Sequence, residues 1–297
     1  MSHNTKPFRT IEQQINILVE RGLKIDDRTE AAHILSCYNY YRLSGYTLTL
    51  RRDDRFSNGT SLNDVMQIYN FDAELRSLLL YELEYIEVSI RTHIGYYHAQ
   101  QYGPLGYLKS NSFIDCERYI KFKQDVDEAI KEQSDREVFV KHHLDNCDGE
   151  FPIWVIVELL SFGTLSRLFK NLNKAEVQDR ICSEHYGLIK ADYIENWLQG
   201  LTILRNICAH RGRIYNRNIH FSVKLSTKDK RLLTANELMI QKVSKQLFGY
   251  LFVMKKLIDD TNVWHSFMEN FTALTKKYSF VDLKHYGFPE NWTMLLN

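Results

Sequence analysis

Residues 61–102 place the strongest constraint on the fold, because their apolar side chains recur three or four positions apart. These are Val65, Ile68, Tyr69, Leu75, Leu78, Leu79, Leu83, Ile86, Ile90 and Ile94. This periodicity is typical of an amphipathic helix. Ser61 suits the N-cap, and Gly103 suits the residue that ends the helix. The segment is long for one helix, so we expect a break near Asn70–Asp72.

The rest of the chain also favours helices, because its 297 residues include only 4 prolines and 13 glycines. Thr10 and Gln13 have the spacing of a capping box, and Gly22 is a suitable stop. Further helices are expected at 10–21, 28–38, 115–133, 136–145, 190–210 and 234–259. The sequence predicts a mainly α fold. Residues 1–60 would form an N-terminal helical segment resembling a helix-turn-helix, and residues 61–297 a helical domain with a C-terminal extension.

Charge and cysteine content exclude several classes of protein. The 38 basic and 37 acidic residues nearly cancel, which excludes a uniformly basic nucleic-acid-binding surface but not a local basic patch. The five cysteines show no C-x-x-C spacing, which argues against a zinc ribbon and a disulfide framework. The first ten residues have no apolar run, and no segment is apolar for the length of a membrane span. We therefore expect a cytoplasmic protein without a membrane anchor.

The segment 204–217, LRNICAHRGRIYNR, combines the residue types that metal-free RNA cleavage needs. On a helix, Asn206 and His210 are four residues apart and share a face. A histidine titrates near neutrality and can accept or donate the proton of a ribose hydroxyl. A guanidinium such as that of Arg205 stabilises negative charge on a phosphate in the transition state. Asparagine can orient the imidazole or hold a phosphate oxygen.

The residues that follow are strongly basic. Between 205 and 231 there are eight Lys/Arg and one acid, Asp229. We expect Arg211, Arg213, Asn216 and Arg217 to contact RNA phosphates, and Tyr215 to stack on a base. Arg213 and Arg217 would extend the helical face of His210 if the helix continued past Gly212. Alternatively, the run is only a solvated face, and the Arg-x4-His spacing arises by chance.

Four blocks together resemble the Abi-like family (AbiD/AbiF) of bacterial abortive-infection proteins. They are NYYRLSGY (39–46), YNFDAELRSLLLYELEYIEVSIRTHIGYY (69–97), FPIWVIVELLSFGTLSRLF (151–169) and LRNICAHRGRIYNR (204–217). The family is implicated in phage defence and is similar to the HEPN superfamily of helical RNases, whose signature is R-x4-6-H. The resemblance implies a HEPN-like helical bundle in which Arg205 and His210 are catalytic and Asn206 supports them. It also implies a homodimer and, more weakly, a partner RNA that restrains the protein.

A second pair has similar spacing, Arg91 and His98. It could form a second Arg/His site. In the alternative, Glu87 and Arg91 form an ion pair one helical turn apart, beside the main site, and His98 is an ordinary surface residue.

These observations lead to a metal-independent endoribonuclease of a toxin-like phage-defence system, with RNA as substrate and without a cofactor or metal. One alternative is a non-catalytic HEPN module that binds RNA. The other is a DNA-binding regulator that acts through residues 10–45, although the second helix there has a mixed-charge exposed side.

Overall fold

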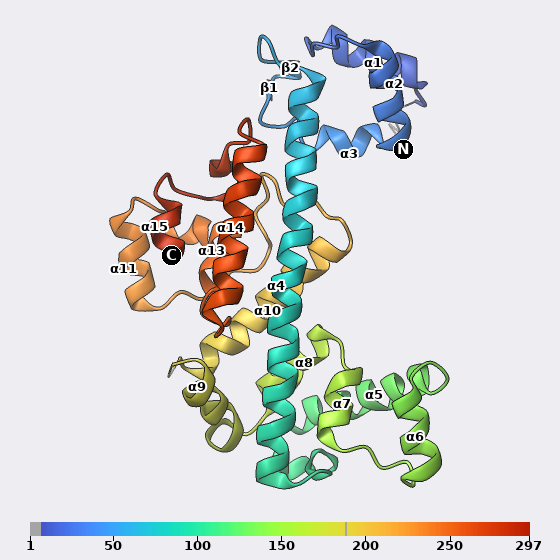
Figure 1. The fold of residues 1–297 in the computed structure, drawn as a ribbon, viewed down its shortest axis with the longest axis vertical. Coiled ribbons are helices and arrows are strands. Elements are labelled where there is room, and N and C mark those ends of the chain that lie inside the picture. The colour runs from blue at the N-terminus through green and yellow to red at the C-terminus, as the bar shows by residue number, and fades with distance from the viewer. Residues whose placement is uncertain (1–6, 188) are drawn as a thin grey trace, which may run out of the picture.

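One helix, α4 (Leu62–Tyr102), forms the axis of the molecule, and the other elements pack along it (Figure 1). The computed structural model describes residues 7–187 and 189–297. At 1.5 Å per residue, the 41 residues of α4 span about 60 Å. A capping box formed by Ser61 and Asp64 starts the helix, and Gly103, with φ 80°, ends it.

The break expected near Asn70–Asp72 is wrong, because α4 is continuous there. Asp72 lies at the expected break, but it continues the helix with its side chain fully buried. Its carboxylate accepts hydrogen bonds from residues far along the chain, such as the backbone N–H of Tyr215 at 2.8 Å. The polar residue therefore joins α4 to other segments and does not interrupt the helix.

The N-terminal segment packs at one end of α4 (Figure 1). Its elements are α1 (Ile11–Glu20), α2 (Arg28–Cys37), α3 (Tyr40–Ser44) and a hairpin of β1 (Arg51–Arg52) and β2 (Arg55–Phe56). The capping box predicted at Thr10 and Gln13 is present, and Gly22 follows α1 with φ 90°. Arg28 on α2 forms an ion pair with Glu12 on α1, so this cation is already neutralised.

A second group of helices lies to one side of the opposite end of α4 (Figure 1). It contains two 3-10 turns, η1 (Gly106–Leu108) and η2 (Ser110–Ser112), followed by α5 (Cys116–Gln133), α6 (Val138–Asn146), α7 (Ile153–Leu159) and α8 (Phe162–Asn171). The helices predicted at 115–133 and 136–145 are thus confirmed. Helix α7 lies against α4 at Gly95, where a Cβ atom would come within 3.2 Å of Trp154 Cα. A glycine on α4 therefore permits this close packing.

The chain then turns back across α4 through a π-helical turn, η3 (Lys174–Gln178), and the helices α9 (Asp179–His185) and α10 (Ala191–Ala209). The helix predicted at 190–210 is confirmed. Its buried side chains, including Trp197, Leu201 and Leu204, face α4, α8 and the C-terminal helices.

The C-terminal part covers another side of α4. Its elements are α11 (Thr227–Ala235), α12 (Ile240–Val243), α13 (Leu247–Met254), α14 (Thr261–Lys277), η4 (Leu283–Tyr286) and α15 (Trp292–Leu296). The single helix expected over 234–259 is wrong. The chain breaks before α13, where the carbonyls of Ser244 and Lys245 accept the N–H groups of Val223 and Ile219 at 2.9 and 2.7 Å. Tertiary hydrogen bonds therefore replace helical ones at this point.

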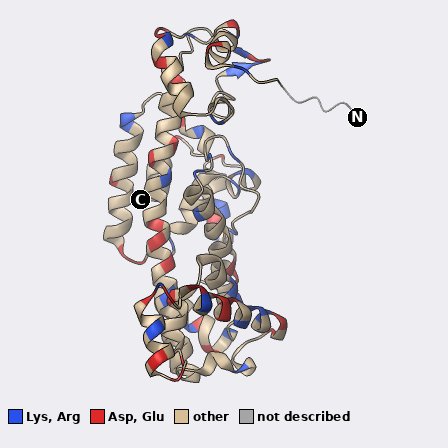
Figure 2. Cartoon of the chain, turned by 90° about the vertical axis from the view of Figure 1, so that its right-hand side faces the viewer, with Lys and Arg blue, Asp and Glu red and all other residues tan. Residues whose placement is uncertain are grey.

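The predicted fold class is confirmed: the protein is mainly α, with 67% of residues in helices. Figure 2 shows basic and acidic residues mixed over these helices, in keeping with the net charge of +1. No helix in the described ranges is long and apolar enough to cross a membrane.

Candidate active site

Helix α10 ends at the predicted catalytic motif. His210 is its C-terminal cap, and Arg211 adopts φ 56°, in the left-handed region. The N–H groups of Arg211 and Gly212 donate to the carbonyls of Cys208 and Ile207 at 3.0 and 2.7 Å, which is a Schellman motif. A left-handed conformation costs a residue with a Cβ atom about 1–2 kcal/mol. The chain therefore turns sharply after His210, and Arg213 and Arg217 do not continue its helical face.

The three motif side chains lie at this end of α10. Arg205 is half-buried, whereas Asn206 and His210 are exposed. The N–H of His210 donates to the carbonyl of Asn206 at 3.0 Å, so the two residues are one helical turn apart. The imidazole of His210 forms no hydrogen bond with any residue in the described part of the chain. Both of its ring nitrogens are therefore available for proton transfer.

A carboxylate on α4 holds Arg205 in place. Glu87 forms an ion pair with Arg91 at 2.5 Å and a longer one with Arg205 at 3.7 Å. Arg205 also donates to Oδ1 of Asn206 at 3.2 Å, and Arg91 donates to the carbonyl of Val157. The side chains of Glu87 and Arg91 are only 11% and 12% exposed, which reduces screening by solvent. The structure thus brings Glu87 and Arg91 together with Arg205.

His98 does not join this group. It is fully buried, and neither ring nitrogen has a hydrogen-bond partner among the described residues. Burial lowers the pKa of its imidazole to about 4, and the ring packs against Tyr102 and Phe113. His98 also lies two helical turns, about 10 Å, along α4 from Arg91. The expectation of a surface histidine is therefore wrong, and this chain does not pair Arg91 with a second accessible imidazole.

The residues predicted to bind RNA after α10 divide into two groups. Arg211 and Asn216 are exposed. Arg213 is half-buried and donates to the carbonyls of Tyr215 and Asn216, while the half-buried Arg217 donates to the carbonyl of Arg213. These two cations hold the loop together.

Tyr215 belongs to the core. It is only 2% exposed, and its hydroxyl contacts that of Thr49. Its ring stacks on Tyr46 with centroids 6.3 Å apart. The expectation that Tyr215 stacks on a base is wrong, because no face of the ring is open to a ligand.

Asp72 anchors the loop that follows His210. Its carboxylate accepts hydrogen bonds from the Tyr46 hydroxyl (2.8 Å), the Tyr286 hydroxyl (3.0 Å), the Ile214 N–H (3.2 Å) and the Tyr215 N–H (2.8 Å), and it forms an ion pair with Arg76. Arg42 adds a second anchor, since it donates to the carbonyl of Arg211 at 2.7 Å. Sequence reasoning missed these two roles, although both residues lie within the family-like blocks.

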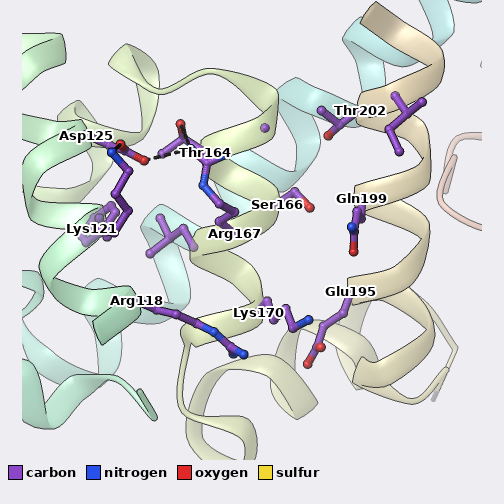
Figure 3. A pocket seen from close by; sticks show the side chains of 14 residues that line it. Arg118, Lys121, Asp125, Thr164, Ser166, Arg167, Lys170, Glu195, Gln199 and Thr202 are labelled. Carbon is purple, nitrogen blue, oxygen red and sulfur yellow. Dashed lines mark hydrogen bonds and ion pairs between the residues drawn. The ribbon is translucent and has the colours of Figure 1, made fainter. Parts of the chain in front are cut away.

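A groove runs beside α10 on the side of Asn206. It encloses a cavity of about 410 Å³ between α5, α8 and α10 (Figure 3). Its charged lining residues are Arg118, Lys121, Asp125, Arg167, Lys170 and Glu195. On α10, Gln199 and Thr202 line the groove, and Asn206 lies one turn beyond Thr202 on the same face. Asp125 pairs with Arg167 at 2.8 Å and with Lys121 at 3.2 Å.

The model of the Abi-like protein family matches residues 33–216, more than half of the chain. The chain belongs to the Abi-like family. The match includes Arg42, Asp72, Glu87 and the Arg205–His210 motif. Membership associates this Abi-like protein with abortive infection, a form of phage defence. Neither a curated protein nor a solved structure matches the chain.

Proposed function

We propose that this Abi-like protein is a metal-independent endoribonuclease with a HEPN-type active site at Arg205, Asn206 and His210. The observation that carries the proposal is the exposed imidazole of His210, which makes no hydrogen bond to a described residue and lies at the same end of α10 as Arg205, the partner of Glu87. Proton-transfer groups contribute most when they are positioned and titrate near the working pH. The end of α10 positions the imidazole of His210.

In the proposed reaction, the ribose 2′-oxygen attacks the adjacent phosphorus atom, and the bond from phosphorus to the 5′-oxygen breaks. A base accepts the 2′ proton, and an acid gives a proton to the departing 5′-oxygen. The products are a 2′,3′-cyclic phosphate and a 5′-hydroxyl. His210 transfers a proton, Arg205 donates hydrogen bonds to the phosphate oxygens, and Asn206 orients the phosphate or the imidazole.

The reaction benefits from two imidazoles, and among the residues that the structure describes this site has only that of His210, because His98 is buried. We therefore infer a homodimer in which two Arg205–His210 motifs face one RNA. Helix α4 exposes Tyr81, Val88 and Tyr96, which are 68%, 54% and 60% exposed. Their spacing places them on one face of α4, next to Arg91. We place these three exposed apolar side chains in the proposed dimer interface.

The groove beside α10 supports an RNA path to the site. Four cations and two carboxylates line it, an excess of two positive charges in a chain of net charge +1. Phosphates can displace Asp125 from Arg167 and Lys121, and the apolar lining residues Phe122 and Ile203 can contact a base. Together with Arg211, this groove takes the place of Tyr215 in the proposed RNA contacts.

The test compares wild type, His210→Ala and His220→Ala in growing cells. His220 is a suitable control, because it is an exposed histidine in the following loop. Wild type and His220→Ala should slow growth and produce RNA with 2′,3′-cyclic phosphate ends. His210→Ala should lose about 10²–10⁴-fold in cleavage rate. Equal toxicity and the same RNA ends from His210→Ala would refute the assignment. RNA binding by wild type without new ends would favour the non-catalytic alternative.

A further inference from the structure

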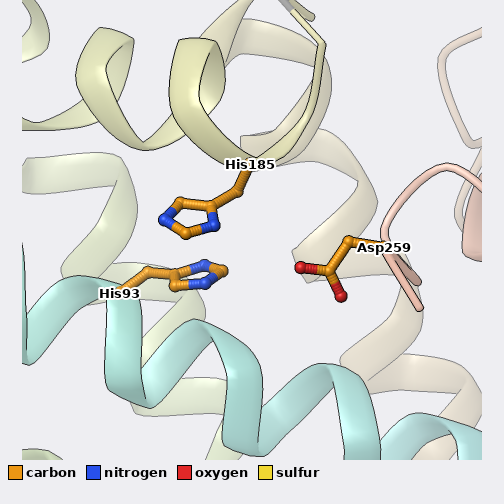
Figure 4. Close-up of side chains that lie close together, drawn as sticks. All are labelled: His93, His185 and Asp259. Carbon is orange, nitrogen blue, oxygen red and sulfur yellow. The ribbon is translucent and has the colours of Figure 1, made fainter.

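Three potential metal ligands meet on another side of α4, about 120° around the helix from Glu87. They are His93 on α4, His185 at the end of α9, and Asp259 between α13 and α14 (Figure 4). One ligand atom of each lies within 4.8 Å of the other two. Three segments that are distant in sequence thus bring together two imidazoles and a carboxylate.

A tyrosine hydroxyl lies at each of the three side chains. Tyr186 contacts Nδ1 of His93 at 3.2 Å, and Tyr97 contacts Nε2 of His185 at 3.0 Å. Tyr85 donates to Oδ1 of Asp259 at 2.7 Å. Histidines that bind a metal commonly use the remaining ring nitrogen in this way, which orients the ring and fixes its tautomer.

The hydrogen bonds determine which nitrogen of His185 is free. The Tyr97 hydroxyl has one hydrogen, and it donates that hydrogen to Oε2 of Glu184 at 2.6 Å. The Tyr97 oxygen must therefore accept from His185, so Nε2 of His185 carries the proton. Nδ1 then has a free lone pair on the side of the ring that faces Asp259 (Figure 4). This is the protonation state that metal binding needs.

The two rings are stacked, with centroids 3.6 Å apart and planes 19° from parallel. Nearly parallel lone pairs do not converge on one ion, so one ring must turn. His185 is half-buried and Asp259 is exposed, which allows both to adjust while the buried His93 stays in place. Two nitrogens, one carboxylate oxygen and a water make up a tetrahedral donor set that suits Zn²⁺.

We propose that His93, His185 and Asp259 bind a zinc ion that ties α4 to α9 and to the segment between α13 and α14. The ion joins these three segments and takes no part in the chemistry proposed at Arg205–His210. The proposal does not depend on the proposed RNase activity.

The test uses thermal unfolding of the chelator-treated full-length protein, with Zn²⁺ or Mg²⁺ as the only added metal. A ligand at 100 times its Kd stabilises the folded state by about 2.7 kcal/mol, so Zn²⁺ should raise Tm by roughly 5 °C. The shift should saturate at one Zn²⁺ per chain. Mg²⁺ should have no effect, because it binds oxygen ligands rather than imidazole.

Three variants locate the effect. His185→Ala and Asp259→Asn should each weaken Zn²⁺ binding at least tenfold. His33→Ala should leave the affinity of this site for Zn²⁺ unchanged. His33 is a demanding control, because it lies 3.9 Å from Cys37 and this pair could itself attract zinc. If His185→Ala fails to fold, the Asp259→Asn variant tests the proposal. This variant should fold, because the Asp259 side chain is exposed and Asn keeps the acceptor for the Tyr85 hydroxyl. The absence of a Zn²⁺-dependent shift in wild type, or an equal shift in the ligand variants, would overturn the proposal.

Discussion

Replacing Asp72 by Ala should destabilise the protein more than any surface substitution. The change leaves Arg76, which is only 5% exposed, without its counter-charge. Breaking a buried ion pair in this way costs about 3–5 kcal/mol. It also removes the acceptor for the N–H groups of Ile214 and Tyr215, and each buried N–H left unsatisfied costs about 1–3 kcal/mol. Because such terms do not add fully, we expect a loss of about 4–6 kcal/mol.

This loss is a large part of the roughly 5–15 kcal/mol that stabilises a typical domain. Urea unfolding followed by far-UV circular dichroism measures it. Asp127→Ala is the matched control, because the side chain of Asp127 is 73% exposed and its removal should change stability by less than about 0.5 kcal/mol. The double variant Asp72→Ala/Arg76→Met should be more stable than Asp72→Ala alone, because Met removes the buried positive charge that would otherwise have no partner. An Asp72→Ala protein within about 1 kcal/mol of wild type would refute the reasoning.

Three further predictions follow from the structure. Burial raises the pKa of the Glu82 carboxyl to about 7, above its unfolded value of 4.5, so the folded state binds the proton more tightly. Stability should therefore fall by about 3 kcal/mol as pH rises from about 4.5 to 7. In urea unfolding at pH 5 and 8, Glu82→Gln should lack this fall, and an unchanged pH dependence would contradict the assignment. Arg205→Lys should lose about 10²–10³-fold in RNA cleavage, because an ammonium group cannot reproduce the planar fork of the guanidinium. Full activity with Lys would show that a point charge suffices. Arg167→Gln and Lys170→Gln should each lower the slope of log Kd against log salt for single-stranded RNA by about 0.7. Unchanged slopes would show that RNA phosphates do not contact Arg167 or Lys170.

Local signals in the sequence were sufficient for most helices. The capping box at Thr10 and Gln13 and the apolar spacing of 61–102 depend on neighbours within a few residues, so they can be recognised without the fold. Asp72 shows the limit of this reasoning. Its partners lie up to 214 positions away, and nothing near it in the sequence distinguishes a buried acceptor from a helix break.

The candidate site was predictable to a similar degree. Helical spacing relates Asn206 to His210 and Glu87 to Arg91, and in each case the structure places the two residues one turn apart. The ion pair between Glu87 and Arg205 joins two helices and needs the fold. The sequence gives no sign that His98 and Tyr215 are buried, because their exposure depends on which segments cover them.

The hydrogen bond between Tyr286 and Asp72 also has a consequence for the order of events during synthesis. The two residues are 214 positions apart, and translation at about 5–20 residues per second needs roughly 10–40 s to cover that distance. Until Tyr286 has left the ribosome, the carboxylate that anchors the loop after His210 lacks one of its partners. A prematurely terminated chain thus carries the Arg205–His210 motif without its complete support. If the proposed RNase activity is correct, fragments from interrupted translation have an incompletely anchored active site.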